Sequence, residues 1–358
     1  MMMTALTSHA ATSPVATPHV VCFGELLLRL KAPGNERLMQ TAMLEATFGG
    51  AEANVGVALA SDGIATSFVT VAPDNALADA GLGELRRYGV DVSRTVRRNG
   101  RLGTYYLEAG AGHRASRVLY DRAGSTLAES GAGAIDWDIA LAGATWFHLS
   151  GITPAISASA AALTLEAVKA ARRLGLIVSC DYNHRASLWQ YGKTPPEIMR
   201  EIVLHVDIGI AGRSDCQEML GVVPASAAPI GAIDHEWFRA LAQQVLDAFP
   251  HMQMQVITLR DGNSAASYGW SACALDRHAY HVGKRYEVEE VVDRVGTGDA
   301  FAAGLLYAMV SGRSHADALE FATAASCLKH TIPGDFNRVR AGEVDALLAG
   351  EGGGRIKR

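Results

Sequence analysis

The stretch Asp293-Arg-Val-Gly-Thr-Gly-Asp-Ala-Phe-Ala-Ala-Gly304 joins a strand, a glycine-rich turn and a helix. Residues 286–292 before the turn are rich in β-branched side chains, which predicts a strand. Residues 300–310 after it are apolar almost all round, which predicts a buried helix. Gly296 and Gly298 let the backbone turn tightly, so that amide N–H groups at the helix start can converge on an anion. The pattern predicts a site for a polyphosphate.

Asp299 follows this turn, and we place it at the N-cap or the first helical position. Asp is a preferred N-cap, so a purely local role is one interpretation. The two glycines, the small Thr297 and Gly304 one turn later favour another interpretation. Phosphoryl transfer to a hydroxyl needs donors around the moving charge and a carboxylate that accepts the hydroxyl proton. The loop offers both.

These residues resemble the C-terminal signature of the ribokinase-like (PfkB) carbohydrate kinases, and Gly49-Gly-Ala-Glu-Ala-Asn-Val-Gly56 is similar to that family's N-terminal signature. The resemblance runs from about residue 20 to about residue 337. It implies a three-layer α/β sandwich with a mostly parallel central sheet and a small antiparallel β lid. It implies ATP and Mg²⁺ as cofactors, and Asp299 as catalytic base. The anion hole that it implies is formed by Gly296, Thr297 and Gly298.

Composition agrees with a globular enzyme. The chain has 358 residues, of which 49% are hydrophobic and 19% charged, so it can bury a large core. A formal net charge of −5 gives no electrostatic footprint for nucleic acid or for an anionic membrane. Five widely spaced cysteines, an odd number, fit reduced core thiols and therefore predict a cytoplasmic protein.

The two ends read as tails. Residues 1–19 lack the basic and apolar regions of a signal peptide, and we expect them to be disordered. Residues 346–358 are rich in glycine and predict a flexible C-terminal tail. No stretch reaches the roughly 18 apolar residues of a membrane span. We therefore expect one kinase domain over residues 20–345, with no membrane partner.

Strands and helices alternate between the tails, as a parallel sheet requires. Two segments, at about 26–48 and 97–122, break this rhythm and predict a small antiparallel sheet. In the resembled family such a sheet is a lid over the sugar and often a dimer surface, which implies a homo-oligomer. The elements expected in the main body are strands at 19–23, 66–71, 146–149, 176–181, 207–210 and 255–259, and helices at 52–61, 76–88, 157–174 and 237–248.

Arginines in and near the lid bear on the substrate. Arg122 lies on a predicted lid strand, and Arg185 lies just past the end of a predicted strand, where open α/β sheets bind ligands. Guanidinium groups match a carboxylate in bidentate fashion, so the pair suggests an acidic sugar. Ion pairing with neighbours such as Asp121 is the alternative for either arginine.

The strings TYYLE, RVLYDRAGS, DYNHRASLW and KHTIPGDFN narrow the resemblance to 2-keto-3-deoxygluconate kinases. That activity transfers a phosphoryl group to the terminal hydroxyl and gives 2-keto-3-deoxy-6-phosphogluconate. The substrate contacts implied by this resemblance, besides Asp299, are Gly50, Asn54, Tyr106, Tyr120, Arg122 and Arg185.

The nucleotide side is less distinctive. The run Thr258-Leu-Arg-Asp-Gly262 resembles the family's nucleotide loop, with a plain hairpin turn as the alternative. Residues 324–329 predict a helix that borders the adenine, although an apolar helix face there is also typical of a core. Nucleotide contacts are thus expected at Thr258, Arg260, Gly262, Ala324 and Lys329.

One departure from the family concerns the metal. Relatives carry Asn-x-x-Glu or Asn-x-x-Asp after the strand at 207–210, where this chain has Gly212-Arg-Ser-Asp215. Asp215 matches the acidic position and is the candidate Mg²⁺ residue, while Gly212 replaces the Asn. The sequence predicts a 2-keto-3-deoxygluconate kinase. The alternatives are another sugar kinase of the family, such as a fructokinase or a ketodeoxygalactonate kinase, or a catalytically weak sugar and nucleotide sensor.

Overall fold

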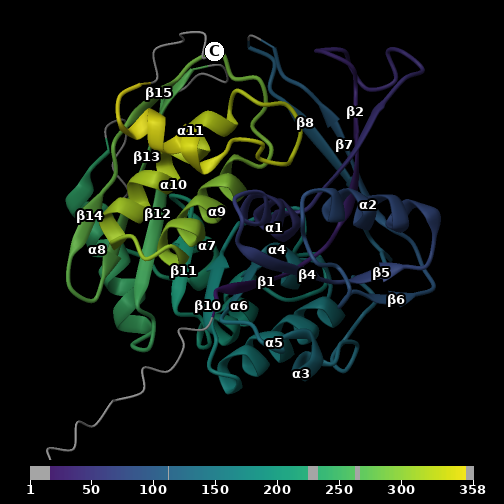
Figure 1. The fold of residues 1–358 in the computed structure, drawn as a ribbon, viewed down its shortest axis with the longest axis horizontal. Coiled ribbons are helices and arrows are strands. Elements are labelled where there is room, and N and C mark those ends of the chain that lie inside the picture. Colours follow the sequence, from purple (N-terminus) through teal and green to yellow (C-terminus); the bar gives the residue numbers. More distant parts are fainter. Residues whose placement is uncertain (1–16, 112, 225–232, 263–266, 352–358) are drawn as a thin grey trace, which may run out of the picture.

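The protein is a three-layer α/β sandwich with a separate sheet standing on one edge (Figure 1). The computed structural model describes residues 17–111, 113–224, 233–262 and 267–351. The predicted N-terminal tail lies outside these residues up to residue 16, and so does the C-terminal tail from residue 352. Among the described residues, no helix combines the length and apolar character that crossing a membrane requires.

The central sheet has the order β14-β13-β12-β11-β10-β9-β1-β4, and β15 also pairs with β13. The strands from β4 to β12 run parallel, whereas β13, β14 and β15 add antiparallel pairings at one edge. The bounds are β1 His19–Phe23, β4 Ala65–Val69, β9 Trp146–Ser150, β10 Ile177–Asp181, β11 Ile208–Ala211, β12 Met254–Asp261, β13 Tyr268–Asp276, β14 Tyr280–Val282 and β15 Tyr286–Val288.

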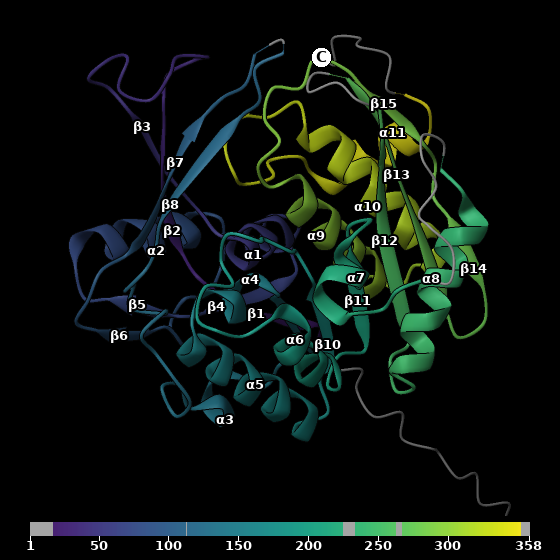
Figure 2. The same cartoon turned by 180° about the vertical axis from the view of Figure 1, so that it is seen from behind.

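Two groups of helices cover the two faces of this sheet, each over its own apolar core. Figure 1 shows the group that includes the C-terminal helices, and Figure 2 shows the other group from behind. The first group is α1 Ala51–Ser61, α2 Ala76–Arg87, α9 Thr297–Val310, α10 His315–Lys329 and α11 Ala341–Leu348. The second is α3 Trp137–Ala140, α4 Ile152–Ile156, α5 Ala158–Arg173, α6 Pro195–Val203, α7 Asp215–Leu220 and α8 His235–Ala248.

Local sequence explains where several helices begin. Ser157 accepts a hydrogen bond from Ala160 N at 3.0 Å and so caps α5. Thr194 and Glu197 form a capping box at the start of α6.

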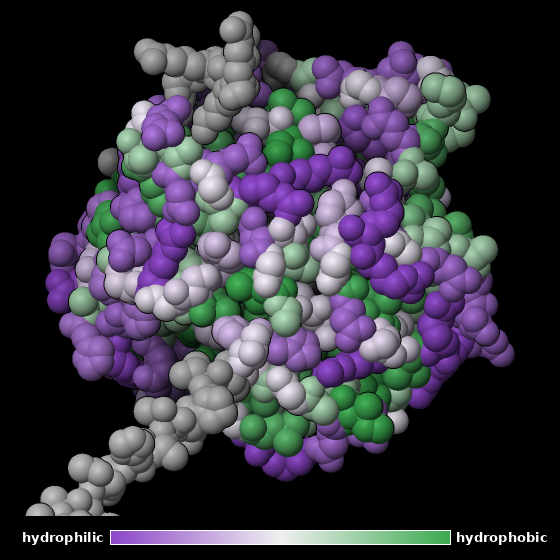
Figure 3. Space-filling model, viewed as in Figure 1, coloured by the Kyte–Doolittle hydropathy of each residue, from purple (hydrophilic) through white to green (hydrophobic). Residues whose placement is uncertain are grey.

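On the face covered by α9, α10 and α11, hydrophilic side chains are spread among smaller apolar areas (Figure 3). All five cysteines are free thiols, as predicted.

The second sheet is the predicted lid, and it projects from the body beside α2 (Figures 1 and 2). Its order is β3-β2-β7-β8, with two antiparallel pairings as predicted. The central pairing of β2 with β7 is parallel, which corrects the purely antiparallel expectation. Two further strands, β5 Val71–Pro73 and β6 Val96–Arg98, form a parallel pair; in the sequence they follow β4 and precede β7. The lid strands are β2 Leu27–Lys31, β3 Glu45–Gly49, β7 Gly103–Glu108 and β8 Arg117–Asp121.

Two expected boundaries were wrong. The strand predicted at 286–292 ends at Val288, because the backbone turns at Glu290, where φ is 50°. Helix α11 continues to Leu348, inside the segment that we expected to be a tail from residue 346. The main-body alternation of strands and helices is otherwise as predicted.

Gly304 has a packing role in this fold. A Cβ at this position of α9 would lie 3.0 Å from Ala322 Cα and 3.1 Å from Ala325 Cβ on α10. The glycine therefore allows the two buried helices to approach closely.

We expect Gly304→Ala to lower the free energy of unfolding. Overpacking a tight contact costs about 1–3 kcal/mol, which outweighs the gain of about 1 kcal/mol in helix propensity. The matched control is Gly83→Ala on α2, whose Cβ would meet only Arg86 Nη2 at 3.6 Å and should stabilise the protein. Urea unfolding of both variants measures the difference. Equal stabilisation by the two substitutions would contradict the packing role of Gly304.

Candidate active site

The glycine turn and the start of α9 form the centre of the site. Gly296 is the N-cap of α9 with a left-handed φ of 81°, and Asp299 is the third helical residue. The expected cap or first position for Asp299 was therefore wrong. Asp299 is buried, and its Oδ2 accepts a hydrogen bond from Asn54 Nδ2 at 2.6 Å. Because the carboxylate is turned toward α1, it does not cap its own helix.

The two glycine-rich motifs meet at this hydrogen bond. Asn54 lies on α1, which begins just after the paired glycines, and α1 packs against α9. A Cβ on Gly50, whose φ is 151°, would overlap Glu25 O, and a Cβ on Gly49 would overlap the Asp335 carboxylate. Both glycines are thus required by close packing. The motifs, 245 residues apart, form one site.

Burial raises the pKa of Asp299 to about 6. The hydrogen bond from Asn54 and the charges of Arg185 and Lys329 oppose this rise, whereas Asp335 adds to it. A carboxylate with such a pKa is ionised near neutral pH and can still take up a proton, as a general base must.

The structure distinguishes the two glycines of the turn. A Cβ at Gly298 would meet nothing within 4 Å, and its φ is not positive. A Cβ at Gly296 would overlap Asp335 O. The positive φ of the turn therefore belongs to Gly296. Thr297 follows it as the first helical residue, and the first amides of α9 have no acceptor within the helix.

A buried ion network lies beneath the turn. Arg29 of β2 donates to Asp293 Oδ2 at 2.6 Å and to Asp335 Oδ1 at 2.7 Å. Tyr105 Oη of β7 donates to the same Asp335 carboxylate. Asp293 also accepts from Val295 N at 3.0 Å, which fixes the entry to the glycine turn. Two lid strands are thus tied to the glycine turn, and none of these four side chains was predicted.

The alternation of side chains between the two faces of β7 corrects the prediction made for Tyr106. Tyr105 pairs with Tyr120 across the sheet, and their rings lie 6.0 Å apart on one face. Tyr106 pairs with Leu119 and lies on the opposite face of the strand. Because Tyr105 reaches Asp335, the face toward the body carries Tyr105 and Tyr120 rather than Tyr106. The two-residue period of a strand was the signal that could have shown this.

The two candidate arginines have different surroundings. Arg122 is buried and paired with Glu25, to which its Nε donates at 2.7 Å, and its guanidinium lies 5.5 Å from the Tyr120 ring. The ion-pair alternative is thus correct for Arg122, although its partner is Glu25. Asp121, the partner that we named, pairs with Arg101 instead. Arg185 is exposed and donates to His184 O at 2.9 Å. Its charge lowers the pKa of Asp299, so Arg185 lies on the same side of the molecule as the glycine turn.

Further carboxylates gather around Asp299. Burial raises the pKa of Glu52 to about 7, although Ser150 N and Oγ donate to it at 2.8 and 2.6 Å. Burial also raises the pKa of Asp181, at the end of β10, and the charges of Asp215 and Asp299 add to the rise. The prediction missed both, although Asp181 stands at the strand end where ligands bind.

The candidate metal residue Asp215 begins α7 and accepts a hydrogen bond from Gly212 N at 2.7 Å. A Cβ at Gly212 would lie 3.1 Å from Asp215 Oδ2. Glycine at this position therefore leaves room for a tight turn. Asp181 and Asp215 together supply the carboxylate oxygens that a hard cation such as Mg²⁺ prefers.

The predicted nucleotide residues separate into two groups. Thr258 and Arg260 lie on β12, and the Arg260 guanidinium stacks 3.9 Å from the Tyr268 ring centre. Gly262 follows with a φ of 101°. Ala324 is fully buried in the core, and Lys329 is also fully buried, with its Nζ donating to Ile332 O at 3.0 Å. The side chains of Ala324 and Lys329 are therefore not available to a nucleotide, and that expectation was wrong.

Comparison with known proteins agrees with this geometry. The chain is 30% identical to a 2-dehydro-3-deoxygalactonokinase of Haloferax volcanii, over 93% of this chain and 98% of the relative. It is 26% identical to a 2-dehydro-3-deoxygluconokinase of Bacillus subtilis, over 88% and 91%. The crystal structure of a 2-dehydro-3-deoxygluconokinase from Thermotoga maritima is similar with a TM-score of 0.86 and 40% identity, over 93% of this chain and 99% of that one.

The family comparison covers most of the chain as well. The pattern of the pfkB family carbohydrate kinases matches residues 17–337, which include both glycine motifs, the lid and the ion network. The matched region also contains the buried carboxylate at the start of α9 and the Asn of the other motif that holds it. The chain thus belongs to the pfkB family of carbohydrate kinases.

Proposed function

We propose that this kinase transfers the γ-phosphoryl group of ATP to the terminal hydroxyl of 2-keto-3-deoxygluconate. The observation that carries the proposal is the buried Asp299, held by Asn54 beside the open N-terminus of α9. A hydroxyl placed next to Asp299 would lose its proton to the carboxylate as the phosphoryl group arrives. The amides of Gly296, Thr297 and Gly298 would hold the phosphoryl oxygens.

The sugar acid is proposed from charge and from the names of relatives. Arg185 and the partly neutralised Arg122 supply the guanidinium groups that a carboxylate matches. Asn54 Oδ1 is buried and has no hydrogen-bond partner among the described residues, so it would accept from a sugar hydroxyl. Gly50 and Tyr120 would complete the pocket. Tyr105 is a further candidate, in place of Tyr106.

A second candidate is 2-keto-3-deoxygalactonate, which the 30% identical Haloferax relative favours by its name. The two acids differ in the configuration of one hydroxyl, and the arginines and Asp299 would serve both. Release of ADP measured against both acids, fructose and ribose tests the assignment. Preference for a neutral sugar would overturn it.

ATP would lie on the side of β12, with Thr258, Arg260 and Gly262 as proposed contacts. Mg²⁺ would be held through Asp215 and Asp181, whose oxygens suit it. When bound, the ion supplies positive charge to the phosphates during transfer. The lid remains a proposed surface for a homo-oligomer, and Val118 and Leu119 on β8 are exposed apolar residues there.

The first prediction concerns the base. Asp299→Asn should lower kcat by roughly 10²–10⁴ and leave substrate binding nearly unchanged, because only the transition state uses the proton acceptor. Asp317→Asn is the matched control, since Asp317 is the third residue of α10 as Asp299 is of α9. Steady-state kinetics and calorimetric binding measure both. An Asp299→Asn variant with more than about a tenth of the wild-type turnover would exclude Asp299 as the base.

The second prediction concerns pH. Protonation of a buried acid with a raised pKa removes the base, so kcat/KM should fall as the pH drops through about 6. Glu52, whose pKa is raised to about 7, is coupled to Asp299, and its protonation would produce the same fall of kcat/KM, here called the acid limb of the pH profile. Glu52→Gln separates the two: the fall of kcat/KM should persist near pH 6, because Glu52 is already largely protonated where Asp299 titrates. Loss of the limb in this variant would assign it to Glu52 instead.

The third prediction concerns the carboxylate. Arg185→Ala should reduce kcat/KM for the sugar acid by roughly 10- to 100-fold, which corresponds to loss of one charged hydrogen bond. Phosphorylation of fructose should be poor and unchanged. Arg117→Ala, which removes an exposed arginine from β8, is the control. An equal loss for acidic and neutral sugars would mean that Arg185 does not recognise the carboxylate.

A further inference from the structure

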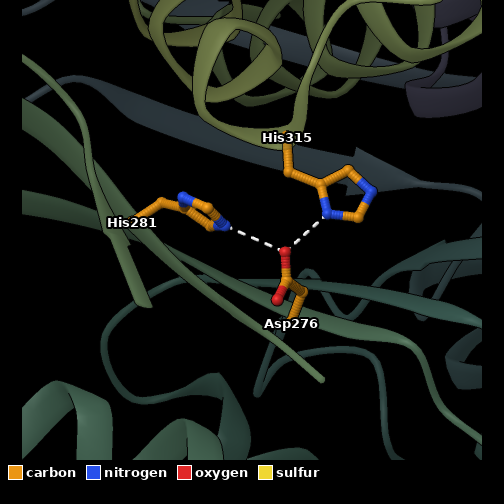
Figure 4. A group of neighbouring side chains, drawn as sticks. All are labelled: Asp276, His281 and His315. Carbon is orange, nitrogen blue, oxygen red and sulfur yellow. Dashed lines mark hydrogen bonds and ion pairs between the residues drawn. The ribbon is translucent and has the colours of Figure 1, made fainter. Parts of the chain in front are cut away.

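Three titratable side chains converge at the sheet edge, outside the site described above (Figure 4). Asp276 is the last residue of β13, His281 lies on β14, and His315 begins α10. Asp276 Oδ2 lies 2.9 Å from His281 Nε2 and 2.6 Å from His315 Nδ1. Figure 4 shows the two imidazoles approaching the same oxygen from different sides. One donor atom from each residue lies within 4.8 Å of the others.

The carboxylate is held in place for these two rings. Its other oxygen, Oδ1, accepts hydrogen bonds from the backbone N–H groups of His278 and Ala279, both at 2.7 Å. Burial acts to raise the pKa of Asp276, but the hydrogen bonds from His315, His281 and the backbone outweigh it and hold the pKa below its usual range. The carboxylate is therefore ionised, with Oδ2 fixed toward the imidazoles.

We propose that Asp276, His281 and His315 form a binding site for a divalent transition-metal ion, with Zn²⁺ as the best match. Two imidazole nitrogens and one carboxylate oxygen are a donor set that Zn²⁺ binds, whereas Mg²⁺ and Ca²⁺ prefer oxygen donors alone. Tetrahedral Zn²⁺ with bonds of about 2.0–2.2 Å places its ligands roughly 3.3 Å apart. To reach this spacing, the contacts of Asp276 Oδ2 with His281 Nε2 and His315 Nδ1 would open by about 0.4 Å and about 0.7 Å.

Metal binding requires a change in the protonation of the two imidazoles. Each ligating nitrogen must be free of its proton, which moves to the other nitrogen of the ring or leaves to solvent when the metal binds. The site also has an open side. The Asp276 side chain is 6% exposed, His281 is 19% exposed and His315 is 40% exposed, so water can take the fourth position.

Arg277, which follows Asp276 in the sequence, is directed away from the cluster. Arg277 donates to the carbonyl oxygens of Met252, Phe249 and Pro250, near the end of α8. Its guanidinium is therefore hydrogen-bonded to backbone carbonyls rather than to Asp276. The Asp276 carboxylate is left to the two imidazoles.

The position of the cluster indicates a structural rather than a catalytic metal. Helix α10 begins at His315 and ends at Lys329, which belongs to the charged surroundings of Asp299. At 1.5 Å per residue, these ends lie about 21 Å apart. A metal here would join the β13–β14 hairpin to the start of α10.

The test uses tag-free protein that has been treated with a chelator and then dialysed. Titration with Co²⁺ should give the intense visible absorption of a four-coordinate site, and calorimetry with Zn²⁺ should give one equivalent bound. Zn²⁺ should also raise the unfolding temperature, because it binds the folded state. Kinase turnover with Mg²⁺ and no Zn²⁺ should be unchanged.

His315→Ala should weaken Zn²⁺ binding by roughly 10- to 100-fold or more and abolish the stabilisation, whereas His113→Ala, which removes an exposed lid histidine, should change neither. Asp276→Asn provides a second variant with the same expected loss. Absence of binding to the wild type would overturn the proposal and leave a carboxylate–histidine ion pair. Equal binding by wild type and His315→Ala would overturn it as well.

Discussion

The ion pairs of Arg29 with Asp293 and Asp335 are the interaction on which the rest of the site depends. All three side chains are buried, and removal of one partner from such a network leaves an uncompensated charge that costs about 3–5 kcal/mol. Arg29 belongs to the lid, Asp293 to the entry of the glycine turn, and Asp335 to the loop after α10. The Asp335 backbone packs closely against Gly296, and the Asp335 carboxylate packs closely against Gly49. The network therefore also fixes where both glycine motifs lie. The lid and the glycine turn are thus one structural unit.

The same arrangement sets the surroundings of Asp299. The packing of α1 against α9 buries the carboxylate and supplies Asn54, and burial raises its pKa. The carboxyl groups of Asp181, Glu52 and Asp335 lie near Asp299, and burial raises the pKa of each. The balancing cations are placed at different depths: Arg29 and Lys329 are buried beneath the turn, while Arg185 is exposed beside it. We infer that the buried cations stabilise the fold, and that the exposed one is free to meet a substrate.

Much of this could be read from the sequence, and the errors have physical causes. Strand and helix alternation was predictable because buried strands and amphipathic helices have distinct periods. The two glycine motifs identified Asp299 and Asn54. The choice of Tyr106 over Tyr105 failed because two adjacent tyrosines on a strand face opposite sides, and only the pairing with β8 shows which side is the body. Lys329 was misplaced because the sequence does not show that its side chain is fully buried, with Nζ donating to Ile332 O. Arg29, Asp293 and Asp335 were missed because their sequence separations of 264 and 306 residues hide the network.

The most direct test of the account is a crystal structure of the Asp299→Asn variant with 2-keto-3-deoxygluconate and a non-hydrolysable ATP analogue. We expect the terminal hydroxyl within hydrogen-bonding distance of residue 299, the γ-phosphate on the first amides of α9, and the sugar carboxylate against Arg122 and Arg185. A sugar bound with its carboxylate away from both arginines, or with its terminal hydroxyl remote from residue 299, would contradict the central claim.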